Sequence, residues 1–195
     1  MGLARRSPGR RAELAVFGVA VALNALGGFA FHGVQTWGAR WVHDAAIMTV
    51  LAFVVAFGTA RILERSSGWL FRRYAAGVVG LGVAVAAFPG AVQALSAMLA
   101  VGAGVTEVVE YRHEVPALRR EGVTARRLAR FSVLAVLALA AAAFLVGRTD
   151  AWLCDPESGF QWHAVWHVLS AAAMALYAYG AIEPHPAGLS SPAGR

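Results

Sequence analysis

Long uninterrupted apolar stretches dominate the pattern of hydrophobic and polar positions along this chain. Residues 14–31 run for 18 positions without a charged side chain, and residues 131–147 run for 17. An α-helix needs roughly 17–25 such residues to cross a hydrocarbon core of about 30 Å. Because membrane barrels are built from short alternating strands instead, the pattern predicts membrane-spanning helices.

The stretches predict an all-α fold, a polytopic transmembrane helical bundle with six spans. The expected spans are about 14–33, 44–63, 69–88, 90–110, 129–147 and 162–182. They form a six-helix transmembrane domain over residues 14–183, between a basic N-terminus (1–13) and a tail (184–195) that we expect to be disordered. A cleaved signal peptide is the alternative for the N-terminus, but the apolar stretch of 18 residues is longer than the roughly 7–15 residues usual in such a peptide.

The composition agrees with a membrane environment. Hydrophobic residues make up 58% of the 195 positions and charged residues 14%, whereas soluble domains carry about 25% charged residues. A soluble fold of this size has no core large enough for that much apolar surface. We therefore expect an integral, multi-pass membrane protein with the lipid bilayer as its main partner.

The arginines predict the orientation of the spans. All 17 basic residues are arginine, and the six-span scheme leaves only Arg40 and Arg148 on the side opposite the other fifteen. Under the positive-inside rule both termini are then cytoplasmic, and the plasma (inner) membrane is the expected location. Because topology accounts for the net charge of +6, we expect no nucleic-acid partner. The lack of lysine excludes a Schiff-base cofactor.

Several ionisable residues fall at the non-cytoplasmic ends of the spans. His32 ends the first span, Asp44 follows His43 at the start of the second, and His163 and His167 open the sixth. Polar groups at such depths are costly, so each is a functional candidate. The topology was derived from arginines alone, yet it brings all of these groups to one side of the membrane.

The spacing of His163 and His167 suggests a metal site. Positions i and i+4 place both imidazoles on one face of a helix, about 6 Å apart, where they can share an ion. His32 as a third ligand would complete a catalytic Zn²⁺ site with a position left for water, which zinc activates. Asp44 is the candidate catalytic residue, either orienting and deprotonating that water or holding a ligand histidine. The alternative is a membrane scaffold whose histidines are merely solvated at the interface.

Two segments resemble the alkaline ceramidase family. Residues 154–177, CDPESGFQWHAVWHVLSAAAMALY, are similar to its last-helix signature, and residues 27–48, GGFAFHGVQTWGARWVHDAAIM, to its F-H motif followed by an aspartate. The wider superfamily includes progestin and adiponectin receptors and haemolysin III-like proteins. The resemblance implies a zinc-dependent membrane hydrolase that cleaves the amide bond of ceramide-like N-acyl lipids, with His32, His163 and His167 binding zinc and Asp44 beside the metal-bound water.

The chain departs from that family in three places. Gly28 stands where the family usually has a serine. The interval from His32 to Asp44 is 12 residues, one longer than expected, so His43 is an alternative inward-facing residue. The first family helix and its acidic segment have no counterpart, so we expect no calcium site of that type.

Two other functions remain open at the level of sequence. One is a non-catalytic receptor or haemolysin III-like membrane protein of the same superfamily, and the other is a b-type haem protein with paired histidine ligands. Products formed from N-acylsphingosines distinguish the first from an enzyme, and a Soret band reveals the second. Away from the histidines, a solvated ion-pair face is predicted by the helical spacing of four charged residues, Glu107, Glu110, Arg112 and Glu114.

Overall fold

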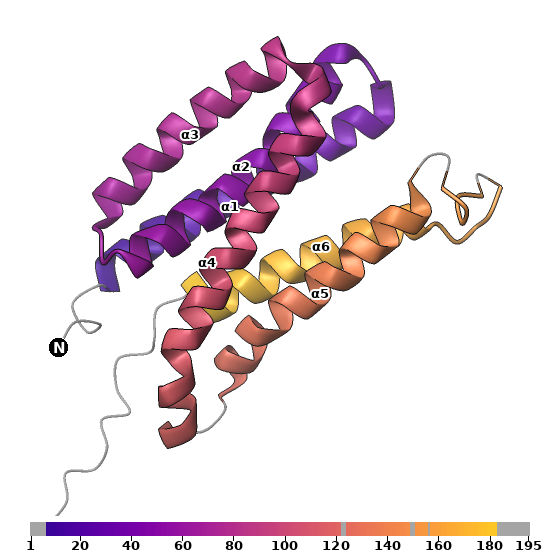
Figure 1. Ribbon diagram of the computed structural model, residues 1–195. Helices are drawn as coiled ribbons and strands as arrows, with labels where there is room; N and C mark the ends of the chain where they lie inside the picture. Colours follow the sequence, from indigo (N-terminus) through magenta and orange to yellow (C-terminus); the bar gives the residue numbers. More distant parts are fainter. Residues whose placement is uncertain (1–6, 122–123, 149–150, 156, 183–195) are drawn as a thin grey trace, which may run out of the picture. The chain divides into compact units, whose positions relative to one another are not determined.

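The computed structural model describes residues 7–121, 124–148, 151–155 and 157–182, and every regular element in these ranges is helical (Figure 1). The elements are α1 (Ser7–Val34), α2 (Trp37–Ile62), α3 (Ser67–Ala87), η1 (Pro89–Ala91), α4 (Val92–Glu121), α5 (Ala125–Gly147), α6 (Trp162–Tyr177) and η2 (Ala178–Ile182). Six helical stretches among them are long and apolar enough to cross a membrane, as the sequence predicts. Residues 1–6 and the predicted tail 184–195 lie outside the described residues.

The turn between α1 and α2 explains why α2 begins earlier than the apolar stretch suggests. Gln35 adopts the left-handed conformation, with φ of 50°, and ends α1. The Thr36 side chain then accepts a hydrogen bond from the Ala39 backbone N–H at 3.2 Å, a typical helix N-cap. As a result Arg40 and His43 lie within the first two turns of α2 rather than before it, and Asp44 follows them instead of opening the helix.

The turn between α2 and α3 is similar in construction. Glu64 has φ of 53°, and the Arg65 backbone N–H donates back to the Ala60 carbonyl at 2.7 Å. This closing bond over a left-handed residue is the usual end of an α-helix. Ser66 caps α3 by accepting from the Trp69 N–H at 3.3 Å. The arginines near this turn are therefore held at a defined end of the α2–α3 pair.

The chain divides into two compact units, one formed by residues 15–124 and the other by residues 1–14 together with 125–195. In the first unit α2 packs against both α3 and α4. Its core centres on Phe53, which is 0% exposed and contacts the rings of Phe17, Phe57 and Tyr74 at centroid distances of 5.3, 5.7 and 5.5 Å. The central helix of this unit is thus α2.

Small residues bring α2 and α4 close together. A Cβ built on Gly58 would lie 2.6 Å from Thr106 Cβ, and one built on Gly102 would lie 3.3 Å from a methyl group of Val55. Membrane helices commonly pack through such small residues, because lipid provides no hydrophobic drive for their association. The same close approach accounts for the burial of polar groups one turn further along.

Glu107 and Glu110 correct an expectation from the sequence. They were predicted to lie on a solvated ion-pair face, but they are only 6% and 5% exposed. Glu110 pairs with Arg61 of α2, with 3.2 Å between Oε2 and Nε, rather than with a neighbour on α4 alone. The prediction was wrong because helical spacing reveals which residues share a face, but not which helix covers that face.

In the second unit α5 and α6 form an antiparallel pair joined by the loop before Trp162 (Figure 1). Glycines allow backbone contact at both ends of the pair. A Cβ on Gly147, the last residue of α5, would lie 2.6 Å from the backbone N of His163, and one on Gly180 in η2 would lie 2.8 Å from the backbone N of Arg130. The end of α5 therefore directly positions the start of α6.

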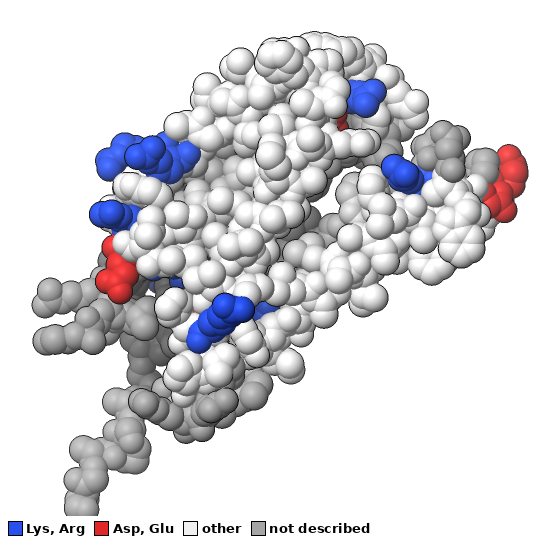
Figure 2. Space-filling view, in the orientation of Figure 1, with Lys and Arg blue, Asp and Glu red and all other residues white. Residues whose placement is uncertain are grey.

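Charged side chains gather at the ends of the helices. On the face shown in Figure 2 the charged groups lie near the two ends of each unit, and a broad uncharged surface lies between these ends. Large apolar side chains are exposed on this kind of surface, among them Val79 (68%), Leu139 (61%) and Val168 (69%). Helices that expose apolar side chains along their length and carry arginines at their ends are typical of membrane-spanning segments.

Candidate functional site

The first part of the candidate site is the pair of imidazoles at the start of α6. His163 and His167 lie one helical turn apart, with ring centroids 4.9 Å apart and ring planes at 80°. One ring nitrogen of each lies within 4.8 Å of the other. Both residues are half-buried. The predicted i, i+4 geometry is therefore present.

Aromatic side chains fix the orientation of the two imidazoles. The Trp166 ring lies 5.0 Å from His163 and 4.4 Å from His167, and Phe144 of α5 contacts Trp166 at 5.0 Å. The backbone of His163 also packs directly on Gly147, as described above. Contacts with α5 thus restrict where the first turn of α6 can lie.

The loop before α6 is ordered by its own polar groups. The Gln161 side-chain amide donates to the carbonyl oxygens of Asp155 and Ser158, at 2.7 and 2.8 Å. The Asp155 carboxylate accepts from the Glu157 N–H at 3.0 Å, and both acidic residues are exposed, as expected of loop acids. Asp155 is therefore occupied in shaping the loop that leads into His163.

The α6 pair is chemically suited to zinc. Imidazole nitrogens bind Zn²⁺ at about 2.0–2.1 Å, which places two ligands of a tetrahedral ion about 3.4 Å apart. The ring nitrogens of His163 and His167 lie within 4.8 Å of each other, a separation close to the one that a shared ion needs. Two imidazole nitrogens on one helical turn are ligands of the type that the predicted metal takes.

The second part of the candidate site lies where α1 ends and α2 begins. The exposed His32 ring lies 5.9 Å from His43, nearly perpendicular to it, at 78°. Phe31 contacts both rings, at 5.5 Å from His32 and 5.0 Å from His43. The turn through Gln35 and Thr36 thus brings the first histidine next to the residue that precedes Asp44.

Asp44 is engaged by two neighbours on its own helix. Its Oδ1 lies 3.0 Å from His43 Nδ1, and its Oδ2 lies 3.7 Å from Arg40 Nε. A carboxylate oxygen accepts hydrogen bonds, so the His43 ring nitrogen that faces it is the donor. The Asp44 side chain is 16% exposed and that of His43 12%, while Arg40 is 68% exposed. The result is an oriented Asp–His pair in a mostly buried position.

Gly27 and Gly28 of α1 lie close to His43 of α2. A Cβ built on Gly28 would lie 3.9 Å from Cδ2 of His43, and one on Gly27 would lie 3.1 Å from the His43 Cα. His43 therefore packs directly against the α1 segment that carries the F-H motif. The only sequence signal for this role was the interval of 12 residues between His32 and Asp44.

The structure brings the predicted residues together in two groups. His32 and Asp44, linked by His43, belong to the unit of residues 15–124, and His163 and His167 belong to the other unit. Binding of one ion by His32 together with the α6 pair stays a prediction. Comparison of the chain with known protein families, with characterised proteins and with solved structures found no match.

Proposed function

We propose that the protein is a zinc-dependent membrane hydrolase that cleaves the amide bond of ceramide-like N-acyl lipids. In this proposal His32, His163 and His167 hold the zinc ion, and the site faces the non-cytoplasmic side of the inner membrane, with both chain termini in the cytoplasm. The observation that carries it is the imidazole pair of α6, whose nitrogens lie within 4.8 Å of each other. The motif resemblance of residues 27–48 and 154–177 to alkaline ceramidases supplies the reaction class.

The zinc ion would activate water and polarise the substrate carbonyl. Asp44 acts as the base for the attacking water, a role that suits a carboxylate held in one orientation. The His43 Nδ1–H and the Arg40 guanidinium provide that orientation in the structure. His43 is in addition the side chain nearest to the place where the family serine would stand.

A lipid substrate agrees with the surroundings of these residues. The helices that carry them expose large apolar side chains, including Leu26 (65%) and Phe29 (83%) of α1 and Val168 (69%) of α6. Such faces are stable only in contact with acyl chains or other helices. A substrate whose chains enter from the bilayer would place its amide at the polar helix ends.

The proposal is tested by measuring zinc content and lipid hydrolysis in the purified full-length protein. We expect His163→Ala and His167→Ala each to lose both bound zinc and fatty-acid release from N-acylsphingosine. His113→Ala is the matched control, because His113 is an exposed histidine at the far end of α4 and should leave both readouts unchanged. Hydrolysis that persists in either α6 variant would refute the assignment of these ligands.

A further variant separates the catalytic step from metal binding. Asp44→Asn keeps a side chain of the same size, and we expect it to retain zinc but to lose about 10²–10⁴-fold in hydrolysis, the usual contribution of a general base. Zinc without any lipid product in the unmodified protein would favour a receptor instead. A Soret band in place of zinc would favour a haem protein.

A further inference from the structure

The loop between α5 and α6 exposes several large apolar side chains. Trp152 is 82% exposed, Phe160 58% and Leu153 36%. The loop runs from residue 148 to residue 161, whereas about 2–8 residues usually connect two packed helices. Apolar side chains that are grouped and exposed on such a long connection indicate an interaction surface.

Hydrogen bonds of the backbone and of one amide hold the shape of this loop. After α5 the Leu153 backbone N–H donates to the Val146 carbonyl at 3.3 Å, so the chain folds back onto the last turn of α5. Before α6 the Gln161 side-chain amide donates to the carbonyl oxygens of Asp155 and Ser158, as described above. The exposed aromatic side chains are thus presented on a surface that other groups shape.

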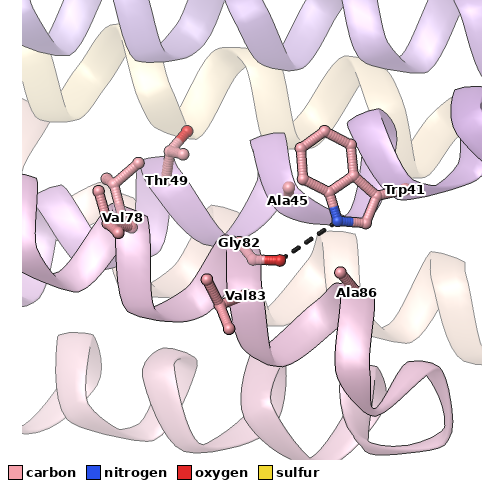
Figure 3. Close-up of a pocket in the computed structure, with 8 residues that line it drawn as sticks. Trp41, Ala45, Thr49, Val78, Gly82, Val83 and Ala86 are labelled. Carbon is pink, nitrogen blue, oxygen red and sulfur yellow. Dashed lines mark hydrogen bonds between the residues drawn. The ribbon is translucent and has the colours of Figure 1, made fainter.

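Trp152 has the properties of a tryptophan at a membrane surface. In the part of the chain that the structure describes, its ring contacts no other aromatic ring and its indole N–H has no hydrogen-bond partner. Trp41, by contrast, donates its indole N–H to the Gly82 carbonyl at 3.3 Å and lines an apolar groove between α2 and α3 (Figure 3). An indole with a large apolar face and a free N–H is most stable where hydrocarbon meets water.

The other end of the loop carries a second apolar group. The Phe160 ring meets the ring of Trp162, the first residue of α6, nearly edge to face, with centroids 5.2 Å apart. Leu145 near the end of α5 and Val168 of α6 are 60% and 69% exposed. The apolar residues of the loop therefore add to the exposed apolar surface of the helix pair, at the end where both helices meet the loop.

The acidic residues of the loop lie between these two apolar groups along the chain. Asp155 and Glu157 are both exposed. Carboxylates mark the outer end of this loop, at the right of Figure 2. Because a charged group is costly in hydrocarbon, this tip belongs in water. The loop thus carries apolar side chains near both helices and charges at its tip, the order that a membrane surface requires.

We propose that the α5–α6 loop is a membrane-surface anchor, with Trp152, Leu153 and Phe160 inserted at the level of the lipid headgroups and the acidic tip in water. A bilayer is favoured over a second copy of the chain or a soluble protein, because both helices that the loop joins are long and apolar enough to span the membrane and bring these residues to its surface. The anchor uses none of the residues of the proposed hydrolase site, so each proposal can fail without the other.

The test introduces the photoreactive amino acid p-benzoyl-phenylalanine into the full-length protein in phosphatidylcholine nanodiscs, in place of Trp152, Phe160 or Glu157. After illumination, mass spectrometry of the intact protein detects a covalently attached lipid. We expect lipid adducts from positions 152 and 160 and a loss of the adduct at position 157, the matched control in the same loop. All three side chains are exposed, so the replacements should leave the fold intact.

Tryptophan fluorescence provides a second measurement that needs no reactive group. The chain has six tryptophans, and the difference in emission between the unmodified protein and W152F isolates Trp152. We expect lipids with brominated acyl chains to quench this emission and iodide in the water to quench it little.

Three results would overturn the proposal. One is quenching of the Trp152 emission by iodide without quenching by brominated lipid. Another is the absence of lipid adducts from positions 152 and 160, or adducts that are equally abundant from position 157. The third is a crosslinked dimer from position 152 in place of a lipid adduct, since a second copy of the chain would then cover the loop.

Discussion

Replacing Gly147 by alanine tests whether the end of α5 positions the histidine pair. The added Cβ would meet the Trp162 backbone and side chain and would lie 2.6 Å from the backbone N of His163. Ordinary contact begins at 3.4 Å, so the start of α6 must move by about 0.8 Å, because backbone atoms cannot rotate away. Overpacking of this kind costs about 1–3 kcal/mol.

The displacement has two measurable effects. The melting temperature of the purified protein should fall by about 2–4 °C for each kcal/mol in a chain of this length. If the proposed zinc site is correct, the bound-zinc stoichiometry should fall as well, because misplacing a ligand by almost 1 Å breaks its coordination geometry.

Gly104→Ala and Gly77→Ala are the matched controls. Both glycines are helical, and a Cβ at either position meets nothing within 4 Å. Alanine there should be neutral or stabilising by about 0.5–1 kcal/mol, since glycine weakens a helix interior. If Gly147→Ala behaves like these controls in both melting temperature and zinc content, the argument that α5 holds His163 in place is wrong.

Two further substitutions test the unit of residues 15–124, and both are measured by thermal unfolding in detergent. Arg61→Ala removes the cation that lies 3.2 Å from the buried Glu110 carboxylate, and we expect a loss of about 3–5 kcal/mol that the double variant R61M/E110L largely recovers. Recovery should fail if the two side chains act independently. Glu64→Gly relieves a left-handed residue with φ of 53° and should stabilise by about 1 kcal/mol; a drop in melting temperature would contradict the turn geometry.

The number and type of helices followed from the sequence because crossing a bilayer requires a long apolar helix, whatever its neighbours are. The predicted fifth and sixth spans end at Gly147 and Ile182, where the helical elements end in the structure. The start of α2 was placed seven residues too late because its first two turns, which carry Arg40 and His43, lie outside the apolar pattern. Thr36, the residue that caps it, was the available signal.

The site was predictable only in part. The one-turn spacing of His163 and His167 is a local property of a helix, so their proximity could be derived before the structure. The contact between His32 and His43, and the orientation of Asp44 by its neighbour, depend on how the chain turns through Gln35 and Thr36. Such a turn has no periodic sequence pattern. The only feature of the sequence that pointed to it was the interval from His32 to Asp44, which is one residue longer than expected.

The local sequence therefore determined three features: the apolar helices, the arginines at their ends, and the two histidines on one face of α6. Tertiary packing decided which faces are covered. It buried Glu110 against Arg61, placed Gly147 on His163, and left an apolar groove between α2 and α3. The physical reason is that periodicity specifies the direction of each side chain from its own helix axis, whereas the partner in that direction depends on contacts between residues far apart in the chain.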